Sequence, residues 1–227
     1  MMQLLTAQLG LVPYAIALEM QRDLARRRIA GEIDEDVLLL LEHPPVVTLG
    51  RTAKEAHIVS SPERLRARGV EVHEVERGGD VTFHGPGQLV GYPIFDLKRH
   101  RQDLHWYLRQ VEQALIVALD EVGIEGERSS GYTGVWTHGR KIASIGVHAR
   151  DWVTWHGFAL NVTTDLSYFD LIVPCGIPQV QMTSVSRELG ADIGIDRMSA
   201  VVARAFGRVF HLEPHDMARE LLEAAPR

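Results

Sequence analysis

The amino-acid sequence predicts a single α+β domain with a mixed, mostly antiparallel sheet flanked by helices. Two observations lead to this fold class. Three strand-like segments follow one another directly, at residues 134–137, 141–149 and 152–162. Turns of two or three residues join them, so neighbouring strands must run antiparallel. These connections also leave no room for crossover helices, and this disfavours a sheet wound from parallel units.

The first half of the chain combines further strands with two helices. A helix is expected from about Pro13, a residue that suits the first helical turn. Ser61 followed by Pro62 predicts the start of a second, short helix that ends at Gly69. The strand candidates of this half, recognised by buried or alternating apolar residues, are 3–9, 36–42, 46–49, 70–76 and 88–96.

Apolar residues at helical spacing predict the longer helices of the second half. One helix starts near Asp103 and closes at Gly123. Another runs from Met198 to Phe210, with Asp196 as its expected cap. A last amphipathic helix is expected from about 213 to 224, at the periphery of the domain. Since no repeat or polar linker interrupts this order, residues 1–227 are expected to form one domain.

Composition and charge exclude several classes of protein. Hydrophobic residues make up 45% and charged residues 24%, which is ordinary for a globular protein, and the net charge of −6 argues against nucleic-acid binding. The longest aliphatic run, 37–41, is too short to span a membrane. The N-terminal residues lack the pattern of a signal peptide, and one cysteine cannot form an internal disulfide. We therefore expect a cytoplasmic protein without membrane or nucleic-acid partners. A monomer is expected as well, although composition and charge do not bear on it.

The only cysteine, Cys175, stands in a segment that predicts a turn. Pro174 and Pro178 prevent a regular helix or central strand, and Gly176 permits a sharp bend just after the sulfur. A thiol on such a turn can face a cleft and act as a nucleophile. The alternative is a structural role, because an isolated cysteine is more often a small buried hydrophobic residue. To act as a nucleophile, the thiol needs a nearby cation that favours the thiolate.

Lys141 is the candidate for that cation. Strict alternation along its strand places Lys141 on one face with Ala143, Ile145 and Val147, and the other face receives Ile142, Ser144 and Gly146. Apolar neighbours on the lysine's own face would desolvate its ammonium group. The alternative is an end-of-strand lysine whose side chain extends into water.

A glycine-rich run from Arg77 to Gly87 precedes these segments. Its glycines signal turns, and their spacing does not match a phosphate-binding loop. They allow close backbone approach and could present N–H groups to a carbonyl or an acyl chain. His84 within the run could donate a hydrogen bond to a bound group, act as a general base, or be an ordinary loop histidine. The other histidines lack metal-ligand spacing, so no metal site is expected.

Four segments together resemble the lipoyl/octanoyl transferase family of lipoate biosynthesis. They are RGGDVTFHGPGQLVGYPI at 77–94, TGVW…GRKIASIGVH at 133–148, WHGFALNV at 155–162 and VPCGI at 173–177. The resemblance follows nearly the whole chain in order, and the combination is specific although no single segment is decisive. The fold that it implies is similar to the catalytic domains of biotin and lipoate protein ligases.

The activity implied by this resemblance is that of an octanoyl-[acyl-carrier-protein]:protein N-octanoyltransferase. Acyl carrier protein would be the donor, and a lysine on lipoyl domains of 2-oxoacid dehydrogenases or on the glycine-cleavage H protein would be the acceptor. Cys175 would hold the acyl thioester, Lys141 would favour the thiolate, and no cofactor is implied. The residues implied to surround the substrate are Arg77, Gly78, Gly79, Asp80, Val81, Thr82, Phe83, His84, Ser144, Ile145, Gly146, Gly157, Phe158 and Ala159.

Several alternatives remain open at this stage. An ATP-dependent lipoate or biotin ligase of the same fold would need no nucleophilic cysteine. An amidotransferase that moves octanoyl between lipoyl domains would share the thiol chemistry and differ in its donor. A non-catalytic acyl- or carrier-binding module would keep Cys175 packed and inert, and a cysteine hydrolase would release the free acid.

Overall fold

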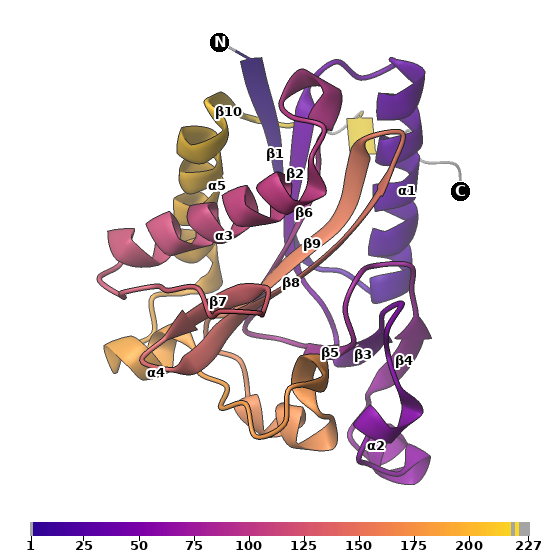
Figure 1. Cartoon of the computed structure of the whole chain (residues 1–227), viewed down its shortest axis with the longest axis vertical. Helices are drawn as coiled ribbons and strands as arrows, with labels where there is room; N and C mark the ends of the chain where they lie inside the picture. The colour runs from indigo at the N-terminus through magenta and orange to yellow at the C-terminus, as the bar shows by residue number, and fades with distance from the viewer. Residues whose placement is uncertain (1, 219–220, 223–227) are drawn as a thin grey trace.

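A computed structural model describes residues 2–218 and 221–222 of the chain, and it shows one large sheet with a small sheet beside it (Figure 1). The large sheet has seven strands in the order β10-β1-β2-β6-β9-β8-β7. Strand β1 runs parallel to both of its neighbours, and the other four pairings are antiparallel. The predicted mixed, mostly antiparallel sheet is therefore confirmed. Its strands are β1 (Met2–Leu11), β2 (Asp36–Glu42), β6 (Gln88–Ile94), β7 (Gly134–Thr137), β8 (Arg140–Arg150), β9 (Val153–Asn161) and β10 (Leu212–Asp216).

The three consecutive strands β7, β8 and β9 pair in sequence as antiparallel neighbours, as their short turns predicted. The first two strands behave differently. Helix α1 (Tyr14–Ala30) crosses between β1 and β2, which pair in parallel. The argument against parallel winding thus holds for the central strands but not for the N-terminal unit, where a helix of this length provides the crossover.

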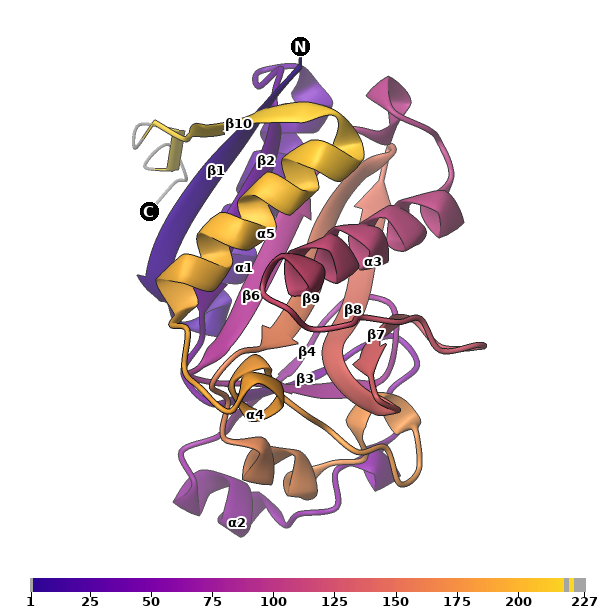
Figure 2. The same cartoon turned by 90° about the vertical axis from the view of Figure 1, so that its left-hand side faces the viewer.

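Helices cover both faces of the large sheet, as Figures 1 and 2 show together. Helix α1 packs on one face through residues such as Ala17 and Leu24. Helices α3 (Leu104–Glu121) and α5 (Ile195–Phe210) cover the other face, where they contribute to the largest apolar core. Asp103 caps α3 as predicted, because its carboxylate accepts a hydrogen bond from the Trp106 amide.

Two predictions for the last part of the chain were wrong. The residue that precedes α5 is Gly194, and Asp196 lies inside the first turn of the helix, where its negative charge still favours the helix dipole. Residues 213–216 belong to strand β10 and not to a helix, because they pair in parallel with β1 at the sheet edge. Helical backbone does occur at residues 221–222, and the remainder of the expected helix after 218 lies outside the described residues.

The small sheet has the order β4-β3-β5, with strands β3 (Val46–Leu49), β4 (Glu71–Glu74) and β5 (Val81–His84). Helix α2 (Pro62–Ala67) lies near it and begins as predicted, since Ser61 accepts a hydrogen bond from the Arg64 amide. Strand β5 was missed, because its four residues stand between two glycine turns that dominated the sequence pattern. Its apolar residues Val81 and Phe83 enter a separate core with Phe169.

A long irregular segment from 163 to 184, orange in Figure 1, follows β9 of the large sheet and packs against the small sheet through Phe169 and Leu171. It contains two short 3-10 helices at Leu166–Leu171 and Pro174–Gly176, and α4 (Val185–Leu189) follows it. Other 3-10 turns lie at Glu55–His57 and Leu97–Arg99. Among the described residues, none of the helices combines the length and the apolar character that a membrane crossing demands.

Candidate active site

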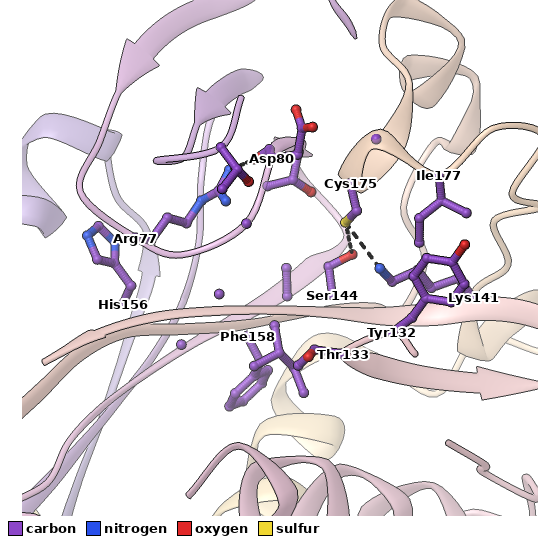
Figure 3. A pocket seen from close by; sticks show the side chains of 18 of the residues that line it. Arg77, Asp80, Tyr132, Thr133, Lys141, Ser144, His156, Phe158, Cys175 and Ile177 are labelled. Carbon is purple, nitrogen blue, oxygen red and sulfur yellow. Dashed lines mark hydrogen bonds between the residues drawn. The ribbon is translucent and has the colours of Figure 1, made fainter. Parts of the chain in front are cut away.

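A cavity of about 450 Å³ lies where β8 and β9 of the large sheet face β5 and the segment that carries Cys175 (Figure 3). Its volume falls within the range of roughly 300–1,000 Å³ that is usual for small-molecule sites. Most of the predicted site residues line it: Arg77, Gly79, Asp80, Thr82, His84, Lys141, Ser144, Ile145, Gly146, Gly157, Phe158, Ala159 and Cys175.

Three of the predicted residues do not line the cavity, and strand geometry explains two of them. Successive side chains on a strand point to opposite faces. Thr82 and His84 of β5 therefore face the cavity, whereas Val81 and Phe83 are buried in the core of the small sheet. Gly78 is also absent from the lining, and its amide donates a hydrogen bond to the Val147 carbonyl.

Cys175 lies at the tip of a strained turn. Its backbone adopts a left-handed conformation with φ 54° and ψ 21°, and Gly176 follows with φ 65°. A non-glycine residue in this conformation costs of order 1–3 kcal/mol, which the surrounding structure must offset. Part of the support is a 2.7 Å hydrogen bond from the Val173 amide to the His57 carbonyl. The turn presents the half-buried thiol to the cavity.

Lys141 and Cys175 are in direct contact. The Lys141 Nζ lies 3.1 Å from the Cys175 Sγ, and the Ser144 Oγ lies 3.7 Å from the same sulfur (Figure 3). Lys141 is fully buried, and its Nζ lies 5.0 Å from the centre of the Trp136 ring, close enough for a cation–π interaction. A buried ammonium group is costly unless an opposite charge accompanies it. The sulfur is the neighbour that can provide this charge, as a thiolate.

The face on which Lys141 lies differs from the prediction, and a β-bulge is the reason. Val135 pairs with Ala143 and Trp136 pairs with Lys141, so Ile142 is an extra residue in β8. A bulge of this kind interrupts the alternation of side chains. Ile142 and Ala143 both enter the main core, and Lys141 shares the cavity with Ser144.

The backbone of Lys141 also holds the segment that follows the cysteine. Its amide donates a 2.8 Å hydrogen bond to the Gln181 carbonyl, and its carbonyl accepts a 2.9 Å bond from the Thr183 amide. A residue of β8 thus fixes the distal end of the Cys175 segment. The Val173–His57 bond fixes the near end.

Arg77 is buried and braces the glycine-rich loop. Its guanidinium donates hydrogen bonds to the Thr48 carbonyl and hydroxyl and to the carbonyls of Gly78 and Asp80. Burial lowers the pKa of Arg77 from its ordinary value, although the electrostatic influence of nearby groups such as Tyr14 and Asp80 opposes this effect. Arg77 therefore stabilises the wall of the cavity, because its N–H groups donate hydrogen bonds to other groups of the protein.

His84 is held in one protonation state by burial and by a hydrogen-bond network. Burial lowers its pKa to about 3, so the ring is neutral at neutral pH. Its Nδ1 lies 2.8 Å from the Gln88 Oε1, and the Gln88 Nε2 donates to the Asn161 Oδ1. The Asn161 amide in turn donates to the carbonyl of Thr183. In this arrangement Nδ1 carries the proton, and Nε2 can only accept a hydrogen bond.

Sequence reasoning missed several residues of the cavity wall. Tyr14 and Tyr92 line it although they come from α1 and β6. The Tyr92 hydroxyl lies 2.7 Å from the His43 Nε2, and burial lowers the pKa of His43 to about 4. A neutral His43 whose Nδ1 proton is donated to the Val12 carbonyl leaves Nε2 to accept the Tyr92 proton. Nothing in the local sequence distinguishes these residues from ordinary core aromatics.

Two further histidines of the wall lack a sequence signal for a site. His156 adopts a positive φ of 56° inside β9, is buried, and donates its amide proton to the Gln21 side chain. His57 comes from the 3-10 turn that precedes α2, and its Nδ1 lies 2.7 Å from the Asp80 Oδ2. His156 lies within the recognised segment 155–162 but was not singled out there, whereas His57 lies outside all the recognised segments, and only the fold brings it to the cavity. Within the described part of the chain, no group of three His, Cys, Asp or Glu residues could hold a metal ion.

Comparison with known proteins shows the family of this chain. Residues 13–207 match the sequence model of the lipoyl protein ligase A/B catalytic domain. The chain belongs to this family. A relative from Gloeobacter violaceus named octanoyltransferase is 52% identical over 204 residues, which cover 90% of this chain and 89% of the relative. The predicted family and enzyme class, an acyltransferase, are confirmed.

Solved structures of the family's fold extend the agreement. The bi-partite lipoate protein ligase of Thermoplasma acidophilum superposes with a TM-score of 0.77 at 17% identity, covering 99% of this chain and 93% of that one. The biotin protein ligase of Aquifex aeolicus, in complex with biotin and ATP, gives a TM-score of 0.55 at 12% identity, covering 92% and 70%. The predicted similarity to lipoate and biotin ligase catalytic domains is therefore confirmed at the level of the fold.

Proposed function

We propose that this enzyme transfers an octanoyl group from acyl carrier protein to a lysine of lipoyl domains, through a thioester on Cys175. The observation that carries the proposal is the 3.1 Å contact between the fully buried Lys141 ammonium and the Cys175 sulfur. A second support is the relatives named octanoyltransferase, about half identical to this chain over most of its length.

The first half of the reaction uses the ion pair directly. The Cys175 thiolate attacks the carbonyl carbon of the donor thioester, a new carbon–sulfur bond forms, and the bond to the carrier's sulfur breaks. The departing carrier thiolate takes a proton from Lys141. The acyl group then remains on Cys175, and Lys141 is neutral.

The second half returns the site to its starting state. A neutral lysine amine of the acceptor attacks the acyl carbon, and the neutral Lys141 takes one proton from the nitrogen of the tetrahedral intermediate. The carbon–sulfur bond breaks and the thiolate reforms beside the ammonium. Exchange of one thioester for another changes the free energy little, and formation of the amide from the thioester lowers it strongly. The cycle therefore needs no nucleotide.

The acyl chain would occupy the cavity beyond the sulfur. Gly146, Gly157 and Ala159 line this part and present little side-chain bulk, with Phe158 beside them. Burying each methylene contributes about 0.8 kcal/mol, so the preference for chain length should be graded. The polar residues Tyr92 and His156 also line the cavity.

A cytoplasmic location fits this chemistry, because the sulfur must stay reduced. The monomeric state remains a prediction.

Intact-mass measurement tests the proposal. The enzyme is mixed with octanoyl-loaded acyl carrier protein without ATP, and the wild type should gain one octanoyl group. Cys175→Ser should gain none, and addition of a lipoyl domain should discharge the wild-type adduct onto that domain. A wild type that stays unmodified, or that requires ATP to label the lipoyl domain, contradicts the proposal and favours a ligase.

A further inference from the structure

A carboxylate–imidazole pair stands next to the turn that carries Cys175. The His57 Nδ1 lies 2.7 Å from the Asp80 Oδ2, and the other oxygen of Asp80 accepts a hydrogen bond from the Val81 amide. Both side chains are mostly buried and line the cavity. Figure 3 shows Asp80 on the same side of the cavity as Cys175. This arrangement fixes the orientation of the imidazole ring.

The pair packs directly against Gly176. A methyl group placed on Gly176 would lie 2.6 Å from the Asp80 Oδ2 and 3.1 Å from the His57 Cε1. Because Cε1 is bonded to both ring nitrogens, Nε2 lies one bond from the atom that faces the turn. With Nδ1 committed to Asp80, Nε2 carries the lone pair of a neutral ring. In the described part of the chain, no protein group hydrogen-bonds this nitrogen.

The position of His57 also matches a route of approach to the sulfur. A second hollow of about 870 Å³ lies beside the cavity, and His57, Gly176 and Ile177 line both. An amine that reaches Cys175 from the second hollow therefore passes the imidazole.

The proposed reaction leaves one proton without an acceptor. An acceptor lysine arrives as an ammonium with three N–H protons, and the product amide keeps one. Two protons must therefore leave the nitrogen, one before attack and one after it. The neutral Lys141 takes only the second. It can accept just one proton, because it gave one proton to the departing carrier thiolate.

We infer that the His57 Nε2, oriented by Asp80, accepts the first proton from the acceptor lysine and so delivers a neutral amine to the acyl-enzyme. This inference rests on the proposed function. The imidazolium then returns its proton to water. Over the whole cycle, the thioester and the lysine ammonium yield the amide, the free carrier thiol and one proton, so atoms and charge balance. Imidazole is the side chain best suited to exchange a proton near neutral pH.

The test separates loading of the enzyme from its discharge. Wild type and His57→Gln are loaded with octanoyl from the carrier protein, and the adduct on Cys175 is followed by intact mass. The adduct is then discharged with a lipoyl domain or with hydroxylamine, which is already uncharged at neutral pH. We expect His57→Gln to load within about twofold of wild type, and its discharge by the lipoyl domain to fall about 100-fold. Discharge by hydroxylamine should stay within about twofold of wild type.

Matched variants complete the design. Asp80→Asn should show the same selective defect in weaker form, because the ring keeps its nitrogen but loses the charged partner. His215→Gln removes a histidine that lies 3.8 Å from Glu213 on the edge strand β10, and it should change none of the three rates.

The outcomes distinguish a proton-accepting role of His57 from a purely structural one. A His57→Gln variant in which loading and both discharges fall together shows that His57 only shapes the turn, and it overturns the inference. An unchanged rate of discharge by the lipoyl domain overturns it as well. If the wild type forms no adduct on Cys175, the proposed function fails and the inference falls with it; a normal adduct with equal discharge in both proteins refutes the inference alone.

Discussion

Replacing Lys141 by methionine tests the charge relationship at the centre of the site. Methionine keeps an unbranched side chain of similar length and removes the ammonium group, which lies 3.1 Å from the Cys175 sulfur. At an effective dielectric constant of about 20, two unit charges at this separation attract by roughly 5 kcal/mol. The cost of burying both groups offsets part of this attraction, and what remains favours the ammonium–thiolate pair over the neutral pair.

The assay is the rate of alkylation of Cys175 by iodoacetamide, followed by intact mass. A thiolate that lacks the ammonium is intrinsically more nucleophilic, with a Brønsted coefficient of about 0.4–0.5, so the alkylation rate should fall by less than the thiolate population does. We therefore expect Lys141→Met to react about 10-fold more slowly than wild type at neutral pH. At high pH, where both thiols are ionised, the order should reverse and the variant should react faster.

The control is Lys98→Met, which removes a lysine whose side chain is 45% exposed and lies 3.9 Å from Asp96, away from the cavity. It should leave the rate unchanged at both pH values. Equal rates for wild type and Lys141→Met, at neutral and at high pH, would refute the reasoning, because the ammonium would then exert no influence on the sulfur.

Three further predictions concern stability. Acidification should destabilise the fold, because His84 has a pKa of about 3 when folded and an ordinary value of 6.5 when unfolded. The unfolded chain then binds the extra proton, so the free energy of unfolding should fall by about 1.4 kcal/mol per pH unit between pH ~6.5 and the folded pKa of about 3, and urea denaturation of His84→Asn should lack this share of the slope. Gly157→Ala should lose about 1–3 kcal/mol in the same assay, since its methyl would meet the Gly91 carbonyl of β6, and an unchanged midpoint would contradict this packing. Glu112→Ala should lose about 1–3 kcal/mol, because it leaves the buried Gly134 amide without its hydrogen-bond acceptor; an unchanged urea midpoint would show that this hydrogen bond is dispensable.

Local signals predicted most of the regular structure. Asp103 and Ser61 stand where helices begin, because their side chains satisfy amides that the helix leaves unpaired. The strands of the central antiparallel unit followed from short turns, which permit only one direction of pairing. These elements depend on contacts between residues that are close in sequence.

The elements that were mispredicted depend on distant partners. Residues 213–216 were expected to begin an amphipathic helix, and pairing with β1 at the other end of the chain makes them a strand. The bulge at Ile142 likewise arises from the register with β7 and leaves no mark in the sequence of β8. It reversed the predicted face of Lys141, although the residue itself had been identified.

The site could be predicted as far as the family motifs extend. Cys175 and Lys141 stand 34 positions apart, and the resemblance indicated their relationship, which the fold then displays as a contact. His57 lies in a turn with no motif, 23 positions before Asp80, and no pattern of spacing or composition connects the two. A carboxylate–imidazole pair of this kind is found only once the chain is folded.

The double hydrogen bond between the Lys141 backbone and the 181–183 segment has a consequence for the whole catalytic cycle. One residue supplies the ammonium and also restrains the loop on which the sulfur is carried, so the two reacting groups move as one unit. Under the proposed function, this shared anchor limits how far the nitrogen and the sulfur can separate while a protein donor or acceptor is bound.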